Sequence, residues 1–357
     1  MVICGVMITD VPEIEGFEFK KRLAQSARCT LWRAVQRTLE RDVLVVVFLP
    51  EVVENRALGD VLFGVMRVLT QLKSSFIPDV IDMIRTPNEA YVILEDRHAK
   101  KLLELLDGER ITPEKLIEVA IKLAEGFAAL RAVHLVYGGL KPSKVFISED
   151  SDPILLDISP IAFEAGFGEN PPLDALVGSA PYVAPEQYLF PERVDSRADL
   201  FALGLTLYAL ATGQVPFGAF SPEETLDLKL SRKIPSPCDL VPGFPRGLSL
   251  VLTKLSQRVA SDRYADWDEV LFDLHEVRRG NAPGNITGED SVIALPAPKP
   301  HAHAERTIRL QASKLQAYRR MRFSRKRPPV WMLIAWGVIG TLFMAGILLI
   351  FIGLFFV

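Results

Sequence analysis

Three short stretches near the middle of the chain constrain its fold more than any other feature. The first is V-Y-G-G-L-K-P-S-K at residues 136–144, which we call the glycine loop. The second, L-L-D-I-S at residues 155–159, places an aspartate after two leucines. The third, G-S-A-P-Y-V-A-P-E, occupies residues 178–186. No single stretch defines a fold, but their order and separations together are highly specific.

In this order and spacing the three stretches resemble the catalytic loop, the metal-binding motif and the activation-segment end of a protein kinase. The third stretch, with the Gln187 that follows it, is most similar to the bacterial serine/threonine type. The resemblance covers about residues 17–279. It implies an α+β, two-lobed protein-kinase-like fold, with a small twisted β-sheet lobe at 17–95 and a large helical lobe at 96–279.

Local sequence patterns predict elements that fit these two lobes. Residues 17–20, 30–35 and 42–49 are rich in β-branched and aromatic side chains, which is typical of strands. Apolar stripes of helical period follow at 59–73 and 113–133, and the second of these helices resembles the one that supports a catalytic loop. Further helices are predicted at 195–212, 222–232, 247–259 and 267–279.

The resemblance also shows which parts of the kinase chemistry this sequence lacks. The turn that should approach the nucleotide phosphates, residues 24–29, contains no glycine. Val46 replaces the lysine that holds the phosphates, and Val65 lies near the position of the glutamate that pairs with that lysine. The two losses belong together, because a lone buried charge is costly whereas two valines simply pack.

The glycine loop lacks the acid on which phosphoryl transfer depends. Gly139 replaces the aspartate that orients the acceptor hydroxyl and accepts its proton, and glycine can do neither. Lys144 replaces the asparagine that binds a second magnesium ion, so a cation stands where a metal ligand is needed. We therefore assign no catalytic residue.

Two residues keep the identity that nucleotide and metal binding require. By resemblance, Lys141 matches the lysine beside the transferred phosphate and Asp157 matches the metal-binding aspartate. ATP and Mg²⁺ thus stay open as ligands, although no cofactor is assigned. The alternative is that Lys141 is solvated and Asp157 caps a turn. The resemblance implies structural roles for three further residues: Glu186 and Arg263 as an ion pair, and Asp199 as the holder of the catalytic-loop backbone.

Composition narrows the range of partners. The net charge of -3 argues against nucleic acid. The 3 cysteines are scattered without a Cys-x-x-Cys pair, which argues against a disulfide framework or a zinc site. Residues 1–16 form a short N-terminal extension without a basic lead or a long apolar run, so we expect no signal peptide.

The C-terminal part of the chain has a different character. Residues 280–305 are rich in Pro, Gly and Ala and predict a linker, and residues 306–329 contain a basic run up to Arg327. Residues 330–357 contain no charged side chain and are long enough to span a bilayer as one C-terminal transmembrane helix. Because a basic segment before a span is typical of its cytoplasmic side, we expect a single-pass cell-membrane protein with a cytoplasmic kinase-like domain.

The sequence predicts a membrane-anchored pseudokinase, a binding or scaffolding module with a protein partner and with weak or no ATP binding. Gly337, Thr341 and Ala345 lie on one face of the predicted span, and this stripe of small residues permits the close helix pairing of a homodimer. One alternative is an atypical active serine/threonine kinase that transfers phosphate from ATP to protein, with Arg28 or Arg33 replacing the missing lysine. Another is a membrane scaffold in which the C-terminal tail is the working part.

Overall fold

The structure is a computed structural model whose described residues all belong to one compact unit. That unit is Met1–Ala294, and the second unit, Leu295–Val357, lies outside the description. The described residues are 11–26, 28–72, 74–158, 161–163, 179–218 and 221–286.

The predicted membrane-associated part of the chain falls outside these ranges. The basic segment 306–329, the apolar segment 330–357 and the small residues Gly337, Thr341 and Ala345 are therefore not described. Among the residues that are described, no helix is both long and apolar enough to cross a bilayer.

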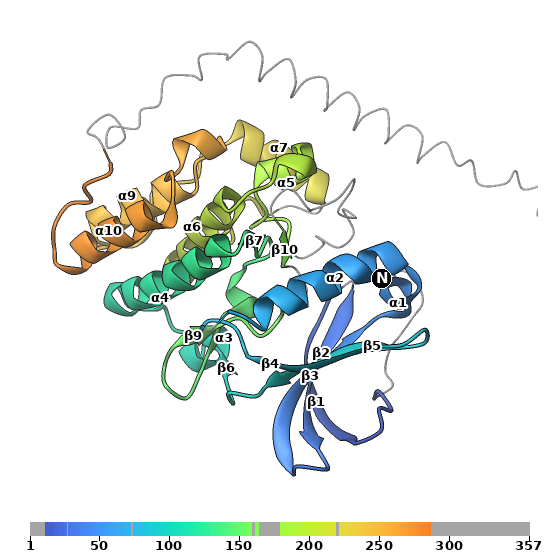
Figure 1. Ribbon diagram of the computed structural model, residues 1–357. Coiled ribbons are helices and arrows are strands. Elements are labelled where there is room, and N and C mark those ends of the chain that lie inside the picture. The colour runs from blue at the N-terminus through green and yellow to red at the C-terminus, as the bar shows by residue number, and fades with distance from the viewer. Residues whose placement is uncertain are drawn as a thin grey trace, which may run out of the picture. The chain divides into compact units, whose positions relative to one another are not determined.

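The small lobe is built on one five-stranded antiparallel sheet with the strand order β1-β2-β3-β5-β4 (Figure 1). β3 lies at the centre, and both of its faces are buried, which explains why its sequence is almost wholly apolar and does not alternate. The strands are β1 (Phe17–Gln25), β2 (Cys29–Gln36), β3 (Arg41–Phe48), β4 (Val80–Arg85) and β5 (Ala90–Glu95).

The register of the sheet determines to which face the Val46 side chain points. By resemblance, Val46 stands at the position of the phosphate-holding lysine. Val46 pairs with Leu31 on β2 and with Val92 on β5. All three belong to a hydrophobic cluster that continues into the large lobe. Neighbouring strand residues point to opposite faces, so Val45 belongs to a second cluster on the other side of the sheet.

Helix α2 (Arg56–Leu69) packs on the inner face of this sheet, after the short helix α1 (Pro50–Glu54). The helix begins a few residues earlier than the predicted 59–73, because the Asn55 side chain accepts a hydrogen bond from the Leu58 N–H at 3.1 Å and caps it. Its buried apolar side chains are Leu62, Phe63, Val65, Met66 and Leu69.

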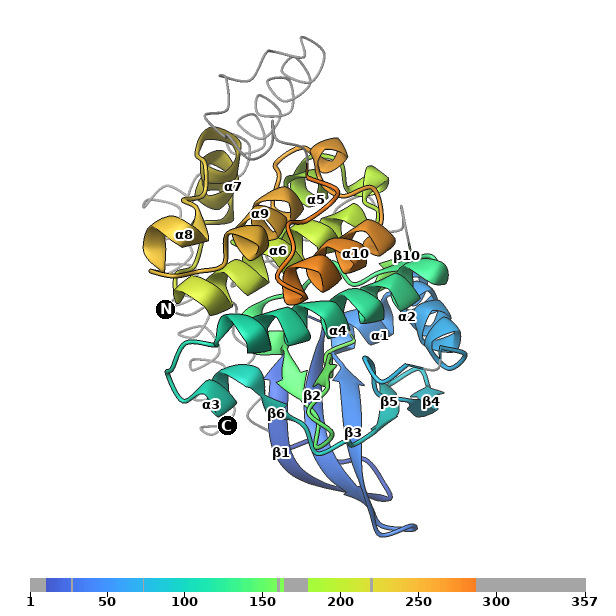
Figure 2. The same ribbon diagram turned by 90° about the vertical axis from the view of Figure 1, so that its left-hand side faces the viewer.

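The large lobe is organised around α6 (Arg197–Thr212), which is buried from Ala198 to its end. α6 stops at Gly213, whose φ of 71° is left-handed and costs glycine little. α4 (Pro113–Ala132) lies between the small lobe and the helices α9 and α10 (Figure 2). The remaining helices are α3 (Leu102–Leu106), α5 (Pro185–Leu189), α7 (Pro222–Ser231), α8 (Pro237–Leu240), α9 (Arg246–Leu255) and α10 (Trp267–Arg278).

Short strands and 3₁₀ helices frame the glycine loop. The loop follows β7 (Leu135–Val136), which pairs with β10 (Ala162–Phe163), and it ends in η1 (Pro142–Lys144). A three-stranded sheet follows, with β8 between β6 and β9. The other short elements are β6 (Lys100–Lys101), β8 (Phe146–Ile147), β9 (Pro153–Ile154), η3 (Pro191–Arg193) and η4 (Ala260–Asp262).

The chain stays attached to the large lobe beyond residue 279, where the predicted lobe ends. The buried carboxylate of Asp273 on α10 accepts hydrogen bonds from the Gly284 N–H at 2.8 Å and the Asn285 N–H at 3.0 Å. The Lys254 ammonium on α9 donates to the Asn285 carbonyl at 2.5 Å. Ile286 packs on the main core cluster. We call residues 281–286 the C-terminal strap.

Candidate functional site

One buried carboxylate holds the backbone of the glycine loop. Asp199, in the first turn of α6, accepts hydrogen bonds from the N–H groups of Tyr137 at 2.8 Å and Gly138 at 2.7 Å. Burial raises the pKa of Asp199 to about 7, and the two N–H donors oppose this rise. Gly138 has a φ of 68°, which residues with a side chain adopt only under strain. The loop therefore requires both the carboxylate and the glycine.

A second side chain fastens the same loop to α5. The Gln187 amide donates from Nε2 to the Gly138 carbonyl at 2.9 Å, and its Oε1 accepts from the Ala184 N–H at 2.9 Å. Both hydrogen bonds are buried, so water competes little for their donors and acceptors. The glycine loop is thus held from α6 and from α5 at once.

Tyr137 connects the glycine loop to Asp157. Its hydroxyl donates a hydrogen bond to the Asp157 backbone carbonyl at 2.9 Å. The side chain is fully buried, and burial, with smaller contributions from the charges of Asp157 and Asp199, raises the pKa of Tyr137 well above its usual value. Tyr137 is consequently a neutral donor, and it ties together two of the three sequence stretches.

Lys144 lies directly against the aspartate that the resemblance assigns to metal binding. The Lys144 Nζ is 3.1 Å from Asp157 Oδ2. Only 17% of the lysine side chain and 7% of the aspartate side chain are exposed, so the pair is largely shielded from solvent. The sequence had placed a cation near this position, but the direct pairing with Asp157 emerges only in the structure.

Lys141 is the second cation at this place. Burial lowers the pKa of Lys141, the nearby Lys144 lowers it further, and Asp157 opposes the shift. Lys141 is therefore within electrostatic reach of both members of the Lys144–Asp157 pair. The two predicted ligand-binding residues, Lys141 and Asp157, are brought together, but with Lys144 beside them.

A divalent metal ion does not fit this arrangement. An ammonium group already contacts Asp157, and its charge would repel a second cation at the same oxygen. In the parts of the chain that the structure describes, no three His, Cys, Asp or Glu side chains gather in a way that could hold a metal. We therefore derive no chemical step through Mg²⁺.

Buried apolar side chains stand at the positions where the resemblance implies the phosphate-holding ion pair. Val46, Val65 and Leu94 are each at most 1% exposed and belong to one cluster. The same cluster includes Tyr137 of the glycine loop and Ile158, which follows Asp157. All five residues thus belong to the main core cluster, which runs through both lobes.

Arg33 does not reach toward the glycine loop. It forms a two-point ion pair with Asp96, which follows β5, and the Asp96 side chain is fully buried. Asp96 also accepts from the His98 N–H at 2.8 Å. For Arg28, the structure shows a pKa lowered by burial. The geometry of Arg33 thus does not favour its use in place of the missing lysine.

Glu186 and Arg263 form a part-buried ion pair that joins α5 to the segment after η4. Arg263 Nη1 and Nη2 lie 2.5 and 2.9 Å from the two oxygens of Glu186. Arg263 Nη1 also donates to the Arg197 carbonyl at 2.6 Å. Such a bidentate contact fixes both distance and orientation, so the pair fastens the end of the activation segment to the base of α6.

Lys229 on α7 is a further buried cation that the sequence reasoning missed. It is 2% exposed, and its ammonium donates to the carbonyls of Ala180 and Val183. Burial lowers the pKa of Lys229 to about 7; Glu186 opposes the shift. The sequence carried an indication of this burial. Lys229 lies three residues after Leu226 in a predicted helix, so the two side chains share one helix face, and Leu226 is buried.

Comparison with known protein families agrees with this geometry. The family model described as "Protein kinase domain" matches residues 47–263, which is more than half of the chain. The match begins next to Val46 and leaves out β1 and β2, the strands on either side of the turn that lacks glycine.

Curated bacterial proteins show the same relationship. Serine/threonine-protein kinase PknL of Mycobacterium tuberculosis is 25% identical over 262 residues, which cover 72% of this chain and 64% of PknL. A protein of Clostridium perfringens named a probable serine/threonine-protein kinase is 23% identical over 264 residues, 74% of this chain and 38% of that protein. The chain thus spans only part of the length of these relatives.

Proposed function

This chain belongs to the protein kinase domain family, and from that premise we propose that it is a pseudokinase. In this proposal the two-lobed domain binds a protein partner and does not transfer phosphate. The domain keeps the contacts that give a kinase its shape: the Asp199 bonds to the glycine loop and the Glu186–Arg263 pair. A stable and defined surface is what a scaffold needs from such a fold.

One observation carries the proposal: the glycine loop is held firmly, yet Gly139 stands at the position of the base. Asp199 and Gln187 hold the backbone of Tyr137 and Gly138, and thereby the position of the adjoining Gly139. Phosphoryl transfer depends on positioning and electrostatics, and a glycine offers no proton acceptor. Val46, Val65 and Lys144 remove further parts of the same machinery.

A phosphoryl-transfer assay tests the proposal. The full chain, purified in a mild detergent, is incubated with radiolabelled ATP, Mg²⁺ and casein, beside an Asp157→Asn variant. We expect no incorporation into casein or into the chain itself above the level of the variant. Incorporation by the wild type that Asp157→Asn abolishes would show an active kinase and overturn the proposal.

The proposal includes anchoring at the cell membrane through residues 330–357. The support is sequence alone: a charge-free apolar segment preceded by the basic residues 306–327. With the basic residues on the cytoplasmic side, the kinase-like domain is cytoplasmic. A homodimer through Gly337, Thr341 and Ala345 is part of the same proposal.

Fractionation of cells tests the anchor. We expect the full chain to resist extraction of the membrane fraction by alkaline carbonate, because an apolar helix that spans the bilayer is not released by charge screening. A variant that lacks residues 330–357 should move to the soluble fraction. Release of the full chain by carbonate would contradict a spanning helix and leave only the basic segment as a peripheral contact.

A further inference from the structure

We infer that Lys144 supplies a resident cation to Asp157 and thereby excludes a divalent metal from the position where the family binds one. The inference rests on the proposed function, since it treats the site as one that no longer needs a metal. It goes beyond the proposed function because it names Lys144 as the group that occupies the metal position. It also predicts that removing the Lys144 ammonium creates a metal site at Asp157.

The ion pair has the burial and distance that the inference requires. The Lys144 Nζ to Asp157 Oδ2 distance is 3.1 Å, and the exposed fractions of the two side chains are 17% and 7%. A carboxylate that has lost most of its water needs a positive partner nearby. A lysine of the same chain provides that partner permanently, whereas a metal ion must be bound from solution.

Several contacts keep the ammonium in this position. The Lys144 backbone N–H donates to the Lys141 carbonyl at 2.9 Å within η1, so the base of the side chain is fixed. Its Nζ lies 5.7 Å from the centre of the Tyr137 ring, a cation–π distance. The Tyr137 hydroxyl, in turn, is bonded to the Asp157 carbonyl at 2.9 Å. The cation and its carboxylate are therefore held by the same ring.

A divalent ion at Asp157 would meet two cations. Hard cations bind carboxylate oxygens at about 2.0–2.6 Å, so a divalent ion on Asp157 Oδ2 would compete with, and repel, the ammonium 3.1 Å from the same oxygen. Lys141 stands three residues before Lys144 in the same loop, and its ammonium is a second positive charge there. An ammonium group already neutralises the Asp157 carboxylate, so a further divalent charge at this oxygen is disfavoured.

The test uses Mn²⁺ as the probe, because free Mn²⁺ gives an electron paramagnetic resonance signal that is lost on binding. Mn²⁺ is titrated into the full chain in detergent, first for the wild type and then for Lys144→Asn. The matched control is Lys122→Asn, which removes a half-exposed lysine 3.6 Å from Asp152 on the surface. The double variant Lys144→Asn/Asp157→Asn reports whether the aspartate is the ligand.

The expected result is a gain of metal binding. The wild type and Lys122→Asn should leave the Mn²⁺ signal unchanged, Lys144→Asn should reduce it, and the double variant should restore it. Mn²⁺ binding by the wild type that Asp157→Asn removes would overturn the inference. So would a folded Lys144→Asn variant that leaves the Mn²⁺ signal unchanged.

A measurement on the wild type keeps the test independent of how well the variants fold. Lysines are acetylated with a limiting amount of an amine reagent, and each site is followed by mass spectrometry. A charged, shielded ammonium reacts slowly, so Lys144 should be modified several-fold more slowly than the half-exposed Lys122. Equal rates at the two lysines would show that the pair does not form, and the inference would fall.

The outcomes separate this inference from the proposed function. A chain that transfers phosphate while Lys144 still excludes Mn²⁺ would refute the pseudokinase and leave the resident cation standing. A chain that binds Mn²⁺ at Asp157 without any phosphoryl transfer would refute the resident cation and leave the pseudokinase proposal standing.

Discussion

Lys229 carries a positive charge into a site from which water is excluded. Its ammonium bonds to two carbonyls at the end of the activation segment and lies 5.5 Å from the centre of the Phe201 ring. The Arg263 guanidinium lies 4.9 Å from the centre of the same ring, and the Glu186 carboxylate, which pairs with Arg263, raises the pKa of Lys229 against the effect of burial. The contacts of Lys229 thus fasten α7 to the segment that precedes α5.

The titration of Lys229 gives a pH-dependent stability. Burial lowers the pKa of the folded-state lysine from 10.5 to about 7. Between these values the unfolded chain binds a proton that the folded chain does not, so stability rises with pH. Compared with Lys229→Met, the free energy of unfolding of the wild type should increase between about pH 7 and pH 10 and stay level below about pH 7.

Urea unfolding of the two proteins at several pH values checks this prediction. The difference between them isolates Lys229, because the other titrating groups are common to both. Lys233→Met, which changes an exposed lysine just beyond α7, is the control and should show no such rise. A wild-type advantage that stays constant across the whole range would contradict a low pKa at Lys229.

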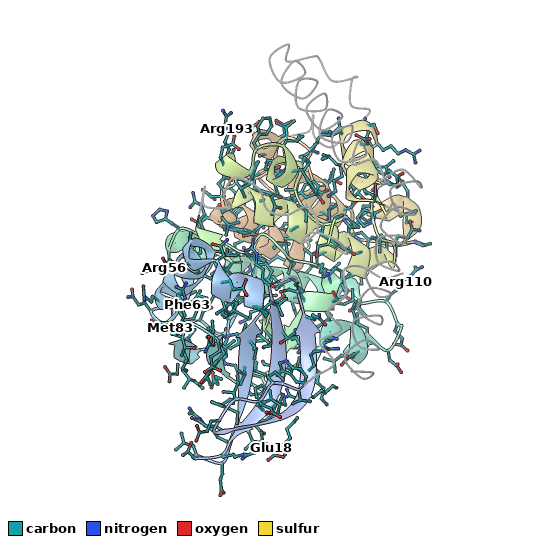
Figure 3. The ribbon with its side chains drawn as sticks, turned by 90° about the vertical axis from the view of Figure 1, so that its right-hand side faces the viewer. Glu18, Arg56, Phe63, Met83, Arg110 and Arg193 are labelled. Carbon is teal, nitrogen blue, oxygen red and sulfur yellow. The ribbon has the colours of Figure 1, made fainter. Side chains whose placement is uncertain are left out.

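At the scale of elements, α2 is positioned from its outer side by β4. Arg85 Nη1 on β4 is 2.6 Å from Asp60 Oδ1, and Nη2 donates to the Arg56 carbonyl at 3.1 Å. The guanidinium lies 5.6 Å from the Phe63 ring centre. Figure 3 shows Arg56 and Phe63 near Met83, a neighbouring residue on β4, on one side of the small lobe.

Glycine at position 59 makes this contact possible. A Cβ there would lie 2.3 Å from Arg85 Nη2, so any other residue would displace the guanidinium. On the inner side of α2, Val65 is buried in the main hydrophobic cluster. Arg85 therefore binds α2 from β4 through Asp60 and the Arg56 carbonyl. The kinase ion pair that would bind this helix is missing from the sequence, because Val65 lies near the position of its glutamate.

We predict that Arg85→Leu loosens α2 locally. The loss should be about 1 kcal/mol, because the Asp60 carboxylate is largely exposed and exposed ion pairs contribute little. Hydrogen exchange of the α2 amides should become correspondingly faster, while the helices of the large lobe stay unchanged. Arg67→Leu, a change of an exposed arginine on the same helix, is the control. Equal α2 exchange in both variants would speak against the role of Arg85.

The C-terminal strap is the second element whose position depends on one charged residue. Asp273 accepts bonds from the Tyr264 hydroxyl at 2.9 Å and from two strap N–H groups. Asp273→Ala removes the acceptor of the buried Tyr264 hydroxyl and of two part-buried strap N–H groups, so we expect a loss of about 2–3 kcal/mol in the free energy of unfolding. Strap residues 281–286 should also become accessible to proteases.

Asp268→Ala is the matched control for the strap. Asp268 lies on the same helix, in its exposed first turn, where a carboxylate contributes only about 0.3–1 kcal/mol through the helix dipole. The strap should remain protected in this variant. If cleavage of the strap were equally slow in Asp273→Ala, its attachment would have to come from the apolar contacts of Ile286 instead.

At the scale of the whole molecule, the two lobes share one core. The main hydrophobic cluster runs from β3 through Tyr137 to Trp267 on α10, where Trp267 stacks on Phe127 with ring centres 5.1 Å apart. The lobes are therefore joined by direct packing of their own side chains.

We accordingly predict that ATP does not stabilise the protein. A ligand at 100 times its dissociation constant adds about 2.7 kcal/mol, which is easily seen as a higher melting temperature. The full chain should show no such shift with millimolar ATP, with or without Mg²⁺. A shift that needs Mg²⁺ and disappears in Asp157→Ala would instead show a working nucleotide site and would contradict the prediction.

The sequence by itself determined the framework of this protein. The apolar run of β3, the Thr112 cap of α4, Gly213 at the end of α6 and the order of the three motif stretches are local signals, and each acts through neighbours along the chain. Glycine at position 139, where the resemblance implies an acid, was equally visible, because it is the identity of one residue at one place.

Only the tertiary structure decided how the charges are paired. Lys144 with Asp157, Lys229 with the carbonyls of residues 180 and 183, and Asp273 with the strap all join groups that are distant in sequence or separated by a turn. A charged side chain is long and can turn toward several partners, and which one it meets depends on how the elements pack. Burial then makes the choice matter, since an ionised group deprived of water must find its partner within the fold.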